Sequence, residues 1–500
     1  MSKRINYQGY IIDPKNLSVD DINKMINDLT VIIDPDKKIE DEDNKFLLYQ
    51  KTNLGNYVIP RYYGVNKFGM PSNVSLNINE LDKMNIEFKG KLRDYQEKII
   101  NITLKSLCYD IKKPLESLKP FGGGLISIPP GKGKTVIGIY LATQLKFRTL
   151  VIVHKNFLVE QWKERIQGYT NAKIGIIQQD KIDIVGKDIV IGMLQSISMK
   201  SYDMEIFRSF PLVLFDECHH LGAKVFSKAL RKIQSPYLIG LSATPERKDG
   251  LEKVFMNYLG DILYKEDLKP NDKVIAQFYE FNIEHPKYKA IFNRYRKEFQ
   301  IPTMISNIVE IEQRNKYISN IIDITLENEP NRKVLILSGR REHCENLIND
   351  YKKQLKYLDN MGLYVGGMKK PQLKISEEKQ LIFGTYEMAQ EALDIPDLDT
   401  LVLATPLKGD IIQTIGRILR KQVADYINPP KIIDIVDNIS CFKNQAKSRY
   451  SYYEVNDYQV EFFTYNEEWQ PNKIDVRFIT PSNKYQKKEE MNKDLFDDDE

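Results

Sequence analysis

The stretch "IPPGKGKTVIG", Ile128–Gly138, decides how the rest of the chain is interpreted. An apolar run, "GLISI" at 124–128, leads into it, and "VIGIYLATQL" at 136–145 follows with the composition of a helix. Glycine is needed where a backbone approaches a phosphate closely, because a Cβ would block the approach. The order of strand, glycine-containing loop and helix therefore predicts a phosphate-binding loop, or P-loop.

In a P-loop, backbone N–H groups and the helix N-terminus surround the phosphates, a lysine reaches the terminal phosphates, and a hydroxyl ligates Mg²⁺. We expect the ligands here to be Pro130, Gly131, Lys132, Gly133, Lys134 and Thr135. The general pattern asks for Gly where Ile128 stands, so the strict match fails at one position. A structural turn that binds nothing is the alternative interpretation.

A second motif, "LVLFDECHH" at Leu212–His220, is an apolar run that ends in two acids. If this strand lies beside the P-loop strand, Asp216 can hold Mg²⁺ and Glu217 can polarise an attacking water. Two acids at a strand end are also common on protein surfaces, so the pair alone would mean little. Following a P-loop in the same part of the chain, the pair indicates a nucleotide hydrolase.

A third motif, "QTIGRILR" at Gln413–Arg420, lies on an expected helix, where Arg417 and Arg420 share one face because they are three residues apart. A guanidinium pair of this kind would stabilise the charge that develops on a γ-phosphate, as an arginine finger does. An exposed basic helix face is the alternative.

Composition and charge limit the class of protein. The chain has 500 residues, 42% of them hydrophobic, which is ample for two to four globular domains. The net charge of +4 permits a polyanionic partner without requiring one. The four cysteines, at 108, 218, 344 and 441, lack metal-ligand spacing and are expected to be free thiols. We find no secretion signal and no run that would span a bilayer, so we expect a soluble protein without a membrane partner.

Short runs rich in Ile, Val and Leu recur in two blocks, at about 92–259 and 331–437, and most are followed by helical patterns. Continuous apolar runs fit buried parallel strands, so the sequence predicts an α/β class with two lobes built on parallel sheets, plus a small N-terminal accessory domain. The expected boundaries are 1–89 for the accessory domain, 90–264 and 329–465 for the lobes, 265–328 for a charged helical connector, and 466–500 for an extension with an acidic, disordered tail. The connector prediction depends on "HPKYKAIFNRYRKEF" at 285–299.

As an ordered set, these motifs resemble those of the superfamily 2 helicases over about residues 90–440. The set is "LRDYQ" (Leu92–Gln96), "PPGKGKT", "VIVHKNFLVEQW" (Val151–Trp162), "MLQS" (Met193–Ser196), "DECH" (Asp216–His219), "SATPERKDG" (Ser242–Gly250), "GTYEMAQEALDIP" (Gly384–Pro396) and "QTIGRILR". "SATPERKDG" and "LVEQWKERI" further resemble the XPB-like DNA translocases, including phage recombination helicases and the poxvirus transcript-release helicase. The resemblance implies two tandem RecA-like lobes and places the chain nearest to the large-DNA-virus members.

Three departures from the family pattern accompany the resemblance. His154 stands where many relatives have Pro, Ala392 where many have Gly, and Ile128 where Ala or Gly is usual. None of the three removes a side chain that would touch phosphate or metal. The prediction of an ATPase that uses Mg²⁺ therefore stands.

The resemblance implies a role for each matched position. Gln96 with Arg93 would read adenine, and Asp394 would be a further nucleotide contact. The catalytic residues would be Lys134, Glu217, Gln413, Arg417 and Arg420. Ser242, Thr244 and His219 would couple nucleotide binding to the nucleic-acid surface, although Ser and Thr there could merely cap the next turn. Nucleic acid would meet His154, Lys155, Gln195, Ser196, Arg340 and Thr385. These contacts would go to the backbone, so binding should be independent of base sequence and weakened by salt.

The resemblance favours an ATP-dependent helicase or translocase acting on duplex DNA or a DNA–RNA hybrid, in viral transcript release or termination or in recombination and repair. It would imply RNA polymerase or transcription factors as partners, and the host cytoplasm, possibly with the virion, as its place. An RNA helicase is the first alternative, but that branch usually reads "DEAD" and ends in "GRTGR", whereas this chain has "DECH" and "GRILR". A scaffold with a vestigial ATPase is the second alternative.

Overall fold

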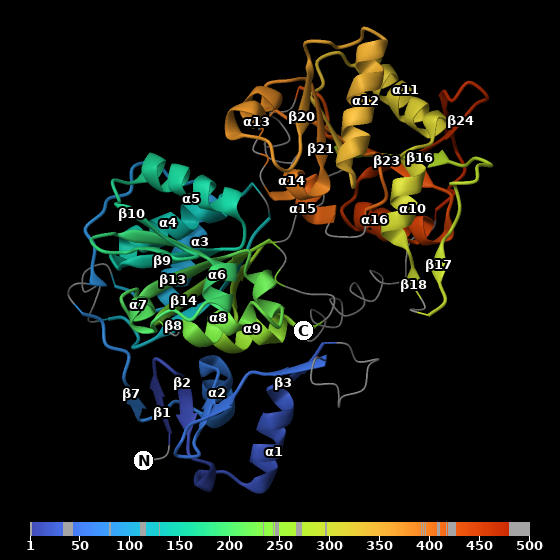
Figure 1. The fold of residues 1–500 in the computed structure, drawn as a ribbon. Helices are drawn as coiled ribbons and strands as arrows, with labels where there is room; N and C mark the ends of the chain where they lie inside the picture. Colours follow the sequence, from blue (N-terminus) through green and yellow to red (C-terminus); the bar gives the residue numbers. More distant parts are fainter. Residues whose placement is uncertain are drawn as a thin grey trace, which may run out of the picture. The chain divides into compact units, whose positions relative to one another are not determined.

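A computed structural model describes the fold (Figure 1). The described residues are 3–33, 44–79, 82–110, 117–129, 131–233, 235–243, 245, 250–266, 273–295, 298–391, 393, 395, 397–407, 411–416, 418 and 427–479. The chain divides into two compact units, Met1–Asp267 and Leu268–Glu500. No helix among the described residues is long and apolar enough to cross a membrane.

The first unit is built on an eight-stranded sheet with the order β11-β10-β12-β9-β13-β14-β8-β15. Its strands are β8 (Gly122–Ser127), β9 (Thr149–Val153), β10 (Ile174–Gln178), β11 (Lys181–Asp183), β12 (Ile189–Met193), β13 (Leu212–Asp216), β14 (Tyr237–Ser242) and β15 (Ile262–Lys265). Every neighbouring pair is parallel except β10 and β11. The central strands are buried on both faces, which is why they read as continuous apolar runs.

Alternate residues of these strands face two different cores, because side chains point to opposite faces of a sheet. One core joins the sheet to α3 (Asp94–Ser106), α4 (Lys134–Leu145) and α5 (Asn156–Tyr169). The other joins it to α6 (Leu194–Met199), α7 (Glu205–Arg208), α8 (Ser227–Lys232) and α9 (Glu252–Leu259). Helices therefore cover both faces of the first sheet, as expected for a parallel sheet.

Residues before the first lobe form a second, five-stranded sheet with the order β5-β6-β2-β1-β7. The elements are β1 (Lys3–Asn6), β2 (Gly9–Ile12), α1 (Val19–Asp28), β3 (Thr30–Ile32), β4 (Lys45–Leu47), β5 (Gln50–Lys51), β6 (Tyr57–Ile59), α2 (Arg61–Phe68) and β7 (Asn73–Val74). Buried residues of this sheet share one hydrophobic core with α9 and the first lobe. The buried Arg61 donates hydrogen bonds to the carbonyl oxygens of Ser235, at 3.0 Å, and Pro236, at 3.2 Å. Residues 1–89 thus belong to the same compact unit as the first lobe, and the domain boundary at 89 stays a prediction.

The second unit contains another eight-stranded sheet, with the order β20-β21-β19-β22-β23-β16-β24-β25. Its strands are β16 (Ile275–Phe281), β19 (Val334–Ser338), β20 (Met361–Tyr364), β21 (Leu381–Thr385), β22 (Thr400–Leu403), β23 (Lys431–Asp437), β24 (Gln459–Tyr465) and β25 (Pro471–Ile474). All neighbours are parallel except β24 and β25. The predicted α/β class with two parallel-rich sheets is confirmed.

Helices cover both faces of this sheet as well. One core includes α10 (Ile301–Ile308), α11 (Glu312–Asn328) and α12 (Arg341–Lys353). The other includes α14 (Tyr386–Glu391), α15 (Ile411–Ile415) and α16 (Ser440–Val455), and α13 (Lys370–Glu377) lies beside β20. The tyrosines of "YSYYEV" at 450–455 are buried in this second core, which confirms that they pack rather than present a stacking surface.

The expected charged helical connector at 265–328 is wrong in two respects. Within 285–299, the described residues include no helix and form only the short antiparallel pair β17 (Phe292–Asn293) and β18 (Glu298–Phe299). In addition, β16 lies inside the second sheet between β23 and β24, and α11 packs in that unit's core. Helical spacing of charges is a weak signal that tertiary pairing overrides.

A candidate nucleotide site at the carboxyl edge of the first sheet

Three of the predicted motifs meet at one edge of the first sheet. The strands β13, β14 and β8 are neighbours and parallel, so their carboxyl ends lie side by side. β8 leads into the P-loop, β13 ends at Asp216, and β14 ends at Ser242. Ligands of open parallel sheets bind at this edge, outside the carboxyl ends of the strands. The sheet order thus brings together residues that are more than a hundred positions apart in the chain.

The P-loop backbone has the conformation that a phosphate cradle needs. Gly131 and Gly133 have φ angles of 80° and 79°, in the left-handed region that glycine adopts without strain. A Cβ at Gly133 would lie 2.5 Å from Gln96 Nε2, so a larger residue there would displace the Gln96 side chain. The helix α4 begins at Lys134, so its first N–H groups and the positive end of its dipole face the loop.

Lys134 and Glu217 form an ion pair at the centre of the site. Lys134 Nζ lies 3.0 Å from Glu217 Oε1, and both side chains are largely buried. Burial would raise the pKa of Glu217, but the charges of Lys134, His219 and His220 outweigh it and lower that pKa to about 2. The catalytic base expected from the sequence is thus ionised and directly beside the lysine expected to reach the phosphates.

The backbone of Glu217 is strained. Its φ of 48° is in the left-handed region, which is uncommon for a residue other than glycine, asparagine or aspartate. Conformations of this kind persist only where the surrounding structure enforces them, and they cluster at functional sites. The turn directs the Glu217 side chain to Lys134, while Glu217 N donates to Asp216 Oδ1 at 3.1 Å.

Asp216 is held by a residue that sequence reasoning placed only in the core. Trp162 Nε1 donates to Asp216 Oδ2 at 2.8 Å, and the indole is fully buried. Burial and the neighbouring Glu217 raise the pKa of Asp216 to about 6, against the lowering effect of the Trp162 hydrogen bond. A buried carboxylate kept beside a second carboxylate fits a position that a cation would stabilise.

The residues present fit Mg²⁺. The ion prefers oxygen ligands, and proteins often hold it through one or two carboxylates plus phosphate oxygens and water. Asp216 and Thr135 offer a carboxylate and a hydroxyl, and Thr135 opens α4 directly after Lys134. Among the described residues, no group of three His, Cys, Asp or Glu side chains could hold a metal by itself. A metal at this site would therefore depend on the nucleotide for further ligands.

His219 connects the acidic motif with the end of β14. Its Nδ1 lies 3.0 Å from Ser242 Oγ and 3.4 Å from Glu217 Oε2. Glu217 Oε2 is buried and has no hydrogen-bond partner in the described part of the chain, and the His219 ring lies beside it. The structure thus brings together two of the three coupling residues expected from the sequence, and Thr244 lies outside the described residues.

Of the two adenine-side residues, Gln96 is buried against the P-loop, whereas Arg93 is exposed. Gln96 accepts from Arg93 N at 3.0 Å and donates to the carbonyl oxygen of Lys132 at 3.2 Å. Tyr95, which sequence reasoning missed, donates to the same carbonyl oxygen at 3.1 Å. Its ring also lies 5.0 Å from Lys132 Nζ. The "LRDYQ" segment therefore fixes the P-loop position, and its adjacency to Gln96 is the signal that would have found Tyr95.

The predicted nucleic-acid contacts differ in exposure. His154 is only 6% exposed, and its ring lies 3.9 Å from that of His220, so it has little surface to offer a strand. Lys155 precedes α5. Gln195 and Ser196 lie in α6, where Ser196 Oγ accepts from Gln179 N.

In the second unit, Arg340 precedes α12 and donates to Ser306 Oγ at 2.9 Å, to the Gly339 carbonyl oxygen at 2.9 Å and to the Pro302 carbonyl oxygen at 2.5 Å. Thr385 ends β21. Gln413 lies in α15, and nothing is described of its side chain. Pro130, Asp394, Arg417 and Arg420 lie outside the described residues.

Comparisons with known proteins identify relatives of this chain. The family model described as the res subunit of type III restriction enzymes matches residues 89–247, which include the P-loop and the acidic motif. A protein of Acanthamoeba polyphaga mimivirus, named provisionally as an ATP-dependent RNA helicase, is 37% identical over 474 residues, covering 93% of this chain and 87% of its own.

More distant relatives share the same core. The DNA 3'-5' translocase XPB2 of Sulfurisphaera tokodaii is 32% identical over 228 residues, covering 44% of this chain and 46% of its own. A solved fragment from Vibrio vulnificus, assigned to the HsdR subunit of a type I restriction enzyme, matches with a TM-score of 0.53 at 15% identity. It covers 79% of this chain and 73% of its own, and it supports the fold alone.

Proposed function

The chain belongs to the superfamily 2 helicases, and we propose that it couples ATP hydrolysis to movement along DNA. As a member of this family it is a nucleic-acid-dependent ATPase. The observation that carries the proposal is the meeting of Lys134, Asp216 and Glu217 at the carboxyl edge of one sheet, directly at the glycine loop. A scaffold that needed only the fold would have no use for a largely buried lysine paired with one of two adjacent, partly buried acids.

The described residues account for the chemistry of one lobe. An entering triphosphate would draw the Lys134 ammonium away from Glu217, because phosphate oxygens offer it more negative charge. The freed Glu217 carboxylate would then accept a hydrogen bond from water and orient it toward the terminal phosphate. Mg²⁺, when bound by Asp216 and Thr135, would neutralise phosphate charge. Trp162 holds Asp216 in place throughout.

His219 links the nucleotide site to the end of β14. Its ring contacts Glu217 and Ser242, so a change in the charge paired with Glu217 alters the hydrogen bonding at the end of β14. We assign Gln413, Arg417 and Arg420, from their sequence motif, the task of stabilising charge on the leaving phosphate. The remaining contacts would go to the nucleic-acid backbone, and binding would weaken with salt.

DNA is the preferred substrate because of two sequence features. The acidic motif reads "DECH" and the arginine motif reads "GRILR", whereas RNA helicases usually read "DEAD" and "GRTGR". A relative named as a DNA translocase is 32% identical over 228 residues. RNA is the second candidate, because the mimivirus relative is named as an RNA helicase at 37% identity. We further propose a role in viral transcription, with RNA polymerase or its factors as partners in the host cytoplasm, or in recombination and repair.

The deciding experiment compares polynucleotides. ATP hydrolysis by the full chain is measured with duplex DNA, a DNA–RNA hybrid and duplex RNA of equal length and at equal salt. We expect duplex DNA or the hybrid to stimulate hydrolysis more strongly than RNA. Stronger stimulation by RNA would replace the DNA proposal with the RNA one. Hydrolysis that no polynucleotide stimulates would contradict a motor and favour the scaffold.

A further inference from the structure

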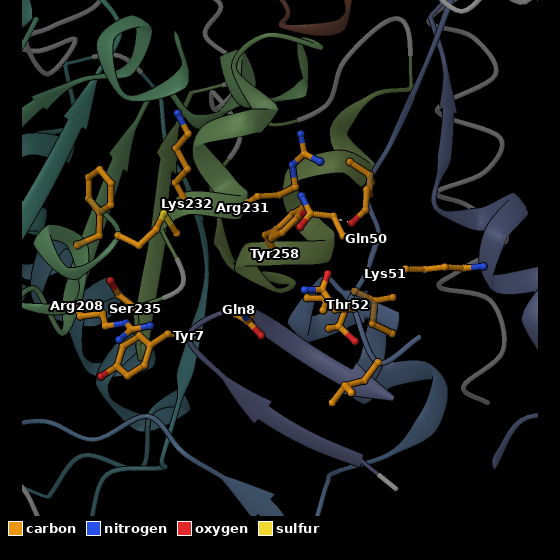
Figure 2. A pocket seen from close by; sticks show the side chains of 17 residues that line it. Tyr7, Gln8, Gln50, Lys51, Thr52, Arg208, Arg231, Lys232, Ser235 and Tyr258 are labelled. Atoms are coloured by element: carbon orange, nitrogen blue, oxygen red, sulfur yellow. Dashed lines mark hydrogen bonds between the residues drawn. The ribbon is translucent and has the colours of Figure 1, made fainter. Parts of the chain in front are cut away.

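A cavity of about 580 Å³ lies in the first unit, between the N-terminal sheet and the helices α7, α8 and α9 (Figure 2). Its position is opposite to that of the nucleotide site within the lobe. Arg208 lies just before β13, and Arg231 and Ser235 lie just before β14, so these residues stand at the amino ends of the two strands. Asp216 and Ser242 stand at the carboxyl ends of the same strands. The cavity is therefore separate from the ATP site.

The contacts around the cavity hold its two walls together. Arg61 bonds two carbonyl oxygens of the segment before β14, and its guanidinium also lies 5.2 Å from the ring of Phe121. On the other side, Tyr258 Oη donates to the carbonyl oxygen of Leu48 at 3.2 Å. The guanidinium of Arg208 lies 5.3 Å from the ring of Tyr7. A cavity between walls fixed by buried contacts is preformed, as small-molecule sites usually are.

The charge of the lining is one-sided. Four cationic residues and no acidic residue are among the described residues that line the cavity. Two of the cations are already engaged: Lys232 Nζ donates to three carbonyl oxygens at the end of α6, and Arg208 pairs with Glu205. Figure 2 shows Lys51 running away from the other labelled side chains. Arg231 remains, and its guanidinium has no hydrogen bond or ion pair to any residue that the structure describes.

One polar group of the lining, the Ser235 hydroxyl, also lacks a protein partner among the described residues. Ser235 is 1% exposed, and its buried Oγ has no hydrogen-bond partner among the described residues. A buried hydroxyl without a partner is unfavourable, so it marks a place where a ligand or water completes the structure. The side-chain amides of Gln8 and Gln50 line the same cavity, and Gln50 lies close to Arg231 and Tyr258 in Figure 2.

Besides Thr52, Asn53 and two tyrosines, the lining includes six apolar side chains that could pack against a flat ring. Leu48, Leu54, Val58, Ile59, Met204 and Phe207 contribute this surface. The size falls within the range of about 300–1,000 Å³ that holds small ligands and cofactors. A cation for a phosphate, amides for the edges of a base and apolar side chains for its faces are the elements of a nucleotide site.

We propose that this cavity binds one nucleotide unit, with its phosphate at Arg231 and its base against the apolar wall. The unit is either a free mononucleotide or the 5′-terminal nucleotide of a strand. The site goes beyond the proposed motor function, because it lies on the far side of the lobe from the P-loop and needs none of its residues.

The test uses the full chain carrying Lys134→Ala, so that the P-loop lysine does not contribute, and AMP as the probe. Calorimetric titration is expected to show saturable binding. Arg231→Gln should weaken it at least about tenfold, as loss of a charge-assisted hydrogen bond does. The matched control is Lys228→Gln, which removes the same charge from an exposed position of α8 outside the cavity, and it should bind AMP like the parent. No saturable binding, or equal affinity in the two variants, would overturn the proposal.

A second variant keeps the test decisive if Arg231→Gln folds poorly. Ser235→Ala removes the buried hydroxyl that has no protein partner, so the variant without AMP should melt at the same temperature as the parent or higher. The rise in melting temperature that AMP produces should become smaller. An undiminished rise would contradict the assignment of Ser235 to the ligand.

Further probes separate the two sources of the nucleotide. Preference for a 5′-phosphorylated oligothymidylate over its 5′-hydroxyl form assigns the site to strand ends, whereas binding of AMP alone assigns it to free nucleotides. Inorganic phosphate that binds as tightly as AMP would overturn the nucleotide class. In the Lys134 parent, Arg231→Gln should keep nucleic-acid-stimulated ATP hydrolysis in the absence of AMP. Loss of that hydrolysis would show that the cavity is not a separate site.

Discussion

At the scale of single residues, the roles of the paired Lys134 and Glu217 predict that substituting each of them affects ATP binding and ATP hydrolysis differently. Lys134→Ala removes a group that contacts phosphate in both binding and reaction, so we expect ATP binding and hydrolysis to be lost together. Glu217→Gln keeps the shape but cannot polarise water, so we expect hydrolysis to fall by at least about a hundredfold while ATP still binds.

The measurements are steady-state hydrolysis with saturating nucleic acid and equilibrium binding of ATP. Lys163→Ala serves as a control, since Lys163 is partly exposed and, within the described residues, forms an ion pair with Glu160 on α5. Parental turnover by Glu217→Gln would show that the base lies elsewhere.

Trp162 gives a second prediction at this scale. Trp162→Phe removes the N–H that bonds the buried Asp216 carboxylate, so unfolding should cost about 1–3 kcal/mol less. Because Phe is also smaller, the hydrogen bond is isolated by a double-mutant cycle with Asp216→Ala in urea unfolding. We expect a coupling of about 1 kcal/mol or more. Simple additivity would mean that the indole acts only through its volume.

At the scale of elements, α11 belongs to the second lobe through a buried ion pair. Arg314 on α11 contacts both carboxylate oxygens of Asp437, at 2.7 and 2.8 Å, where β23 ends. All of these groups are fully buried, so the pair is worth little net stability but breaking it would be costly. Local sequence patterns do not indicate such a pair, so the sequence carried no sign that α11, within the predicted connector 265–328, packs in the second lobe.

His343 yields a pH dependence for the same part of the fold. It lies on α12, and its ring nitrogens are 3.0 Å from Ser338 Oγ at the end of β19 and 3.0 Å from Asn315 Oδ1 on α11. Burial, with the charge of Arg314, lowers its pKa to about 3 in the folded state. The unfolded chain binds a proton below about pH 6.5, so the contribution is complete above that pH and is lost as the pH falls toward 3.

The size of the His343 contribution to the unfolding free energy follows from the difference between its folded and unfolded pKa values. Between pH 7.5 and pH 5, the His343 contribution to the unfolding free energy should fall by about 2 kcal/mol. His343→Gln keeps hydrogen-bonding capacity but does not titrate, so its stability should change less over the same interval. Denaturant unfolding of both proteins at the two pH values checks this. Parallel pH curves would show that the ring is not held neutral.

The elements also show how far the sequence could predict the structure. Apolar runs in the sequence predicted the buried parallel strands. The glycine loop and the acidic motif indicated which of these strands carry the site. The sequence did not predict that β16 belongs to the second sheet, because β16 pairs with strands about 150 and 180 residues later in the chain. Local sequence patterns carry no information about such distant pairing. Tyr95 and Trp162 escaped in part because an aromatic side chain reads as core packing until its polar atom is seen to bond.

At the scale of the whole molecule, the N-terminal sheet is structurally part of the first lobe. Its buried residues and those of α9 form one hydrophobic core, and Arg61 is fully buried at the join. A fragment of residues 89–267, starting where the family model begins to match, would expose this core to water. We expect that fragment to aggregate, whereas a fragment of residues 3–267 should stay monomeric by size-exclusion chromatography and melt cooperatively. A monomeric, cooperatively melting 89–267 fragment would contradict the shared core.

The pairing of Lys134 with Glu217 has a last consequence. In the resting molecule the Lys134 ammonium is paired with one oxygen of the Glu217 carboxylate, so neither charge is fully available to a ligand. A small anion such as sulfate must break this ion pair before it can bind Lys134, which lowers its net affinity. A nucleotide brings several negative oxygens and a bound cation, so it can replace Glu217 as the partner of Lys134. This exchange releases the Glu217 carboxylate that is expected to act on the nucleotide.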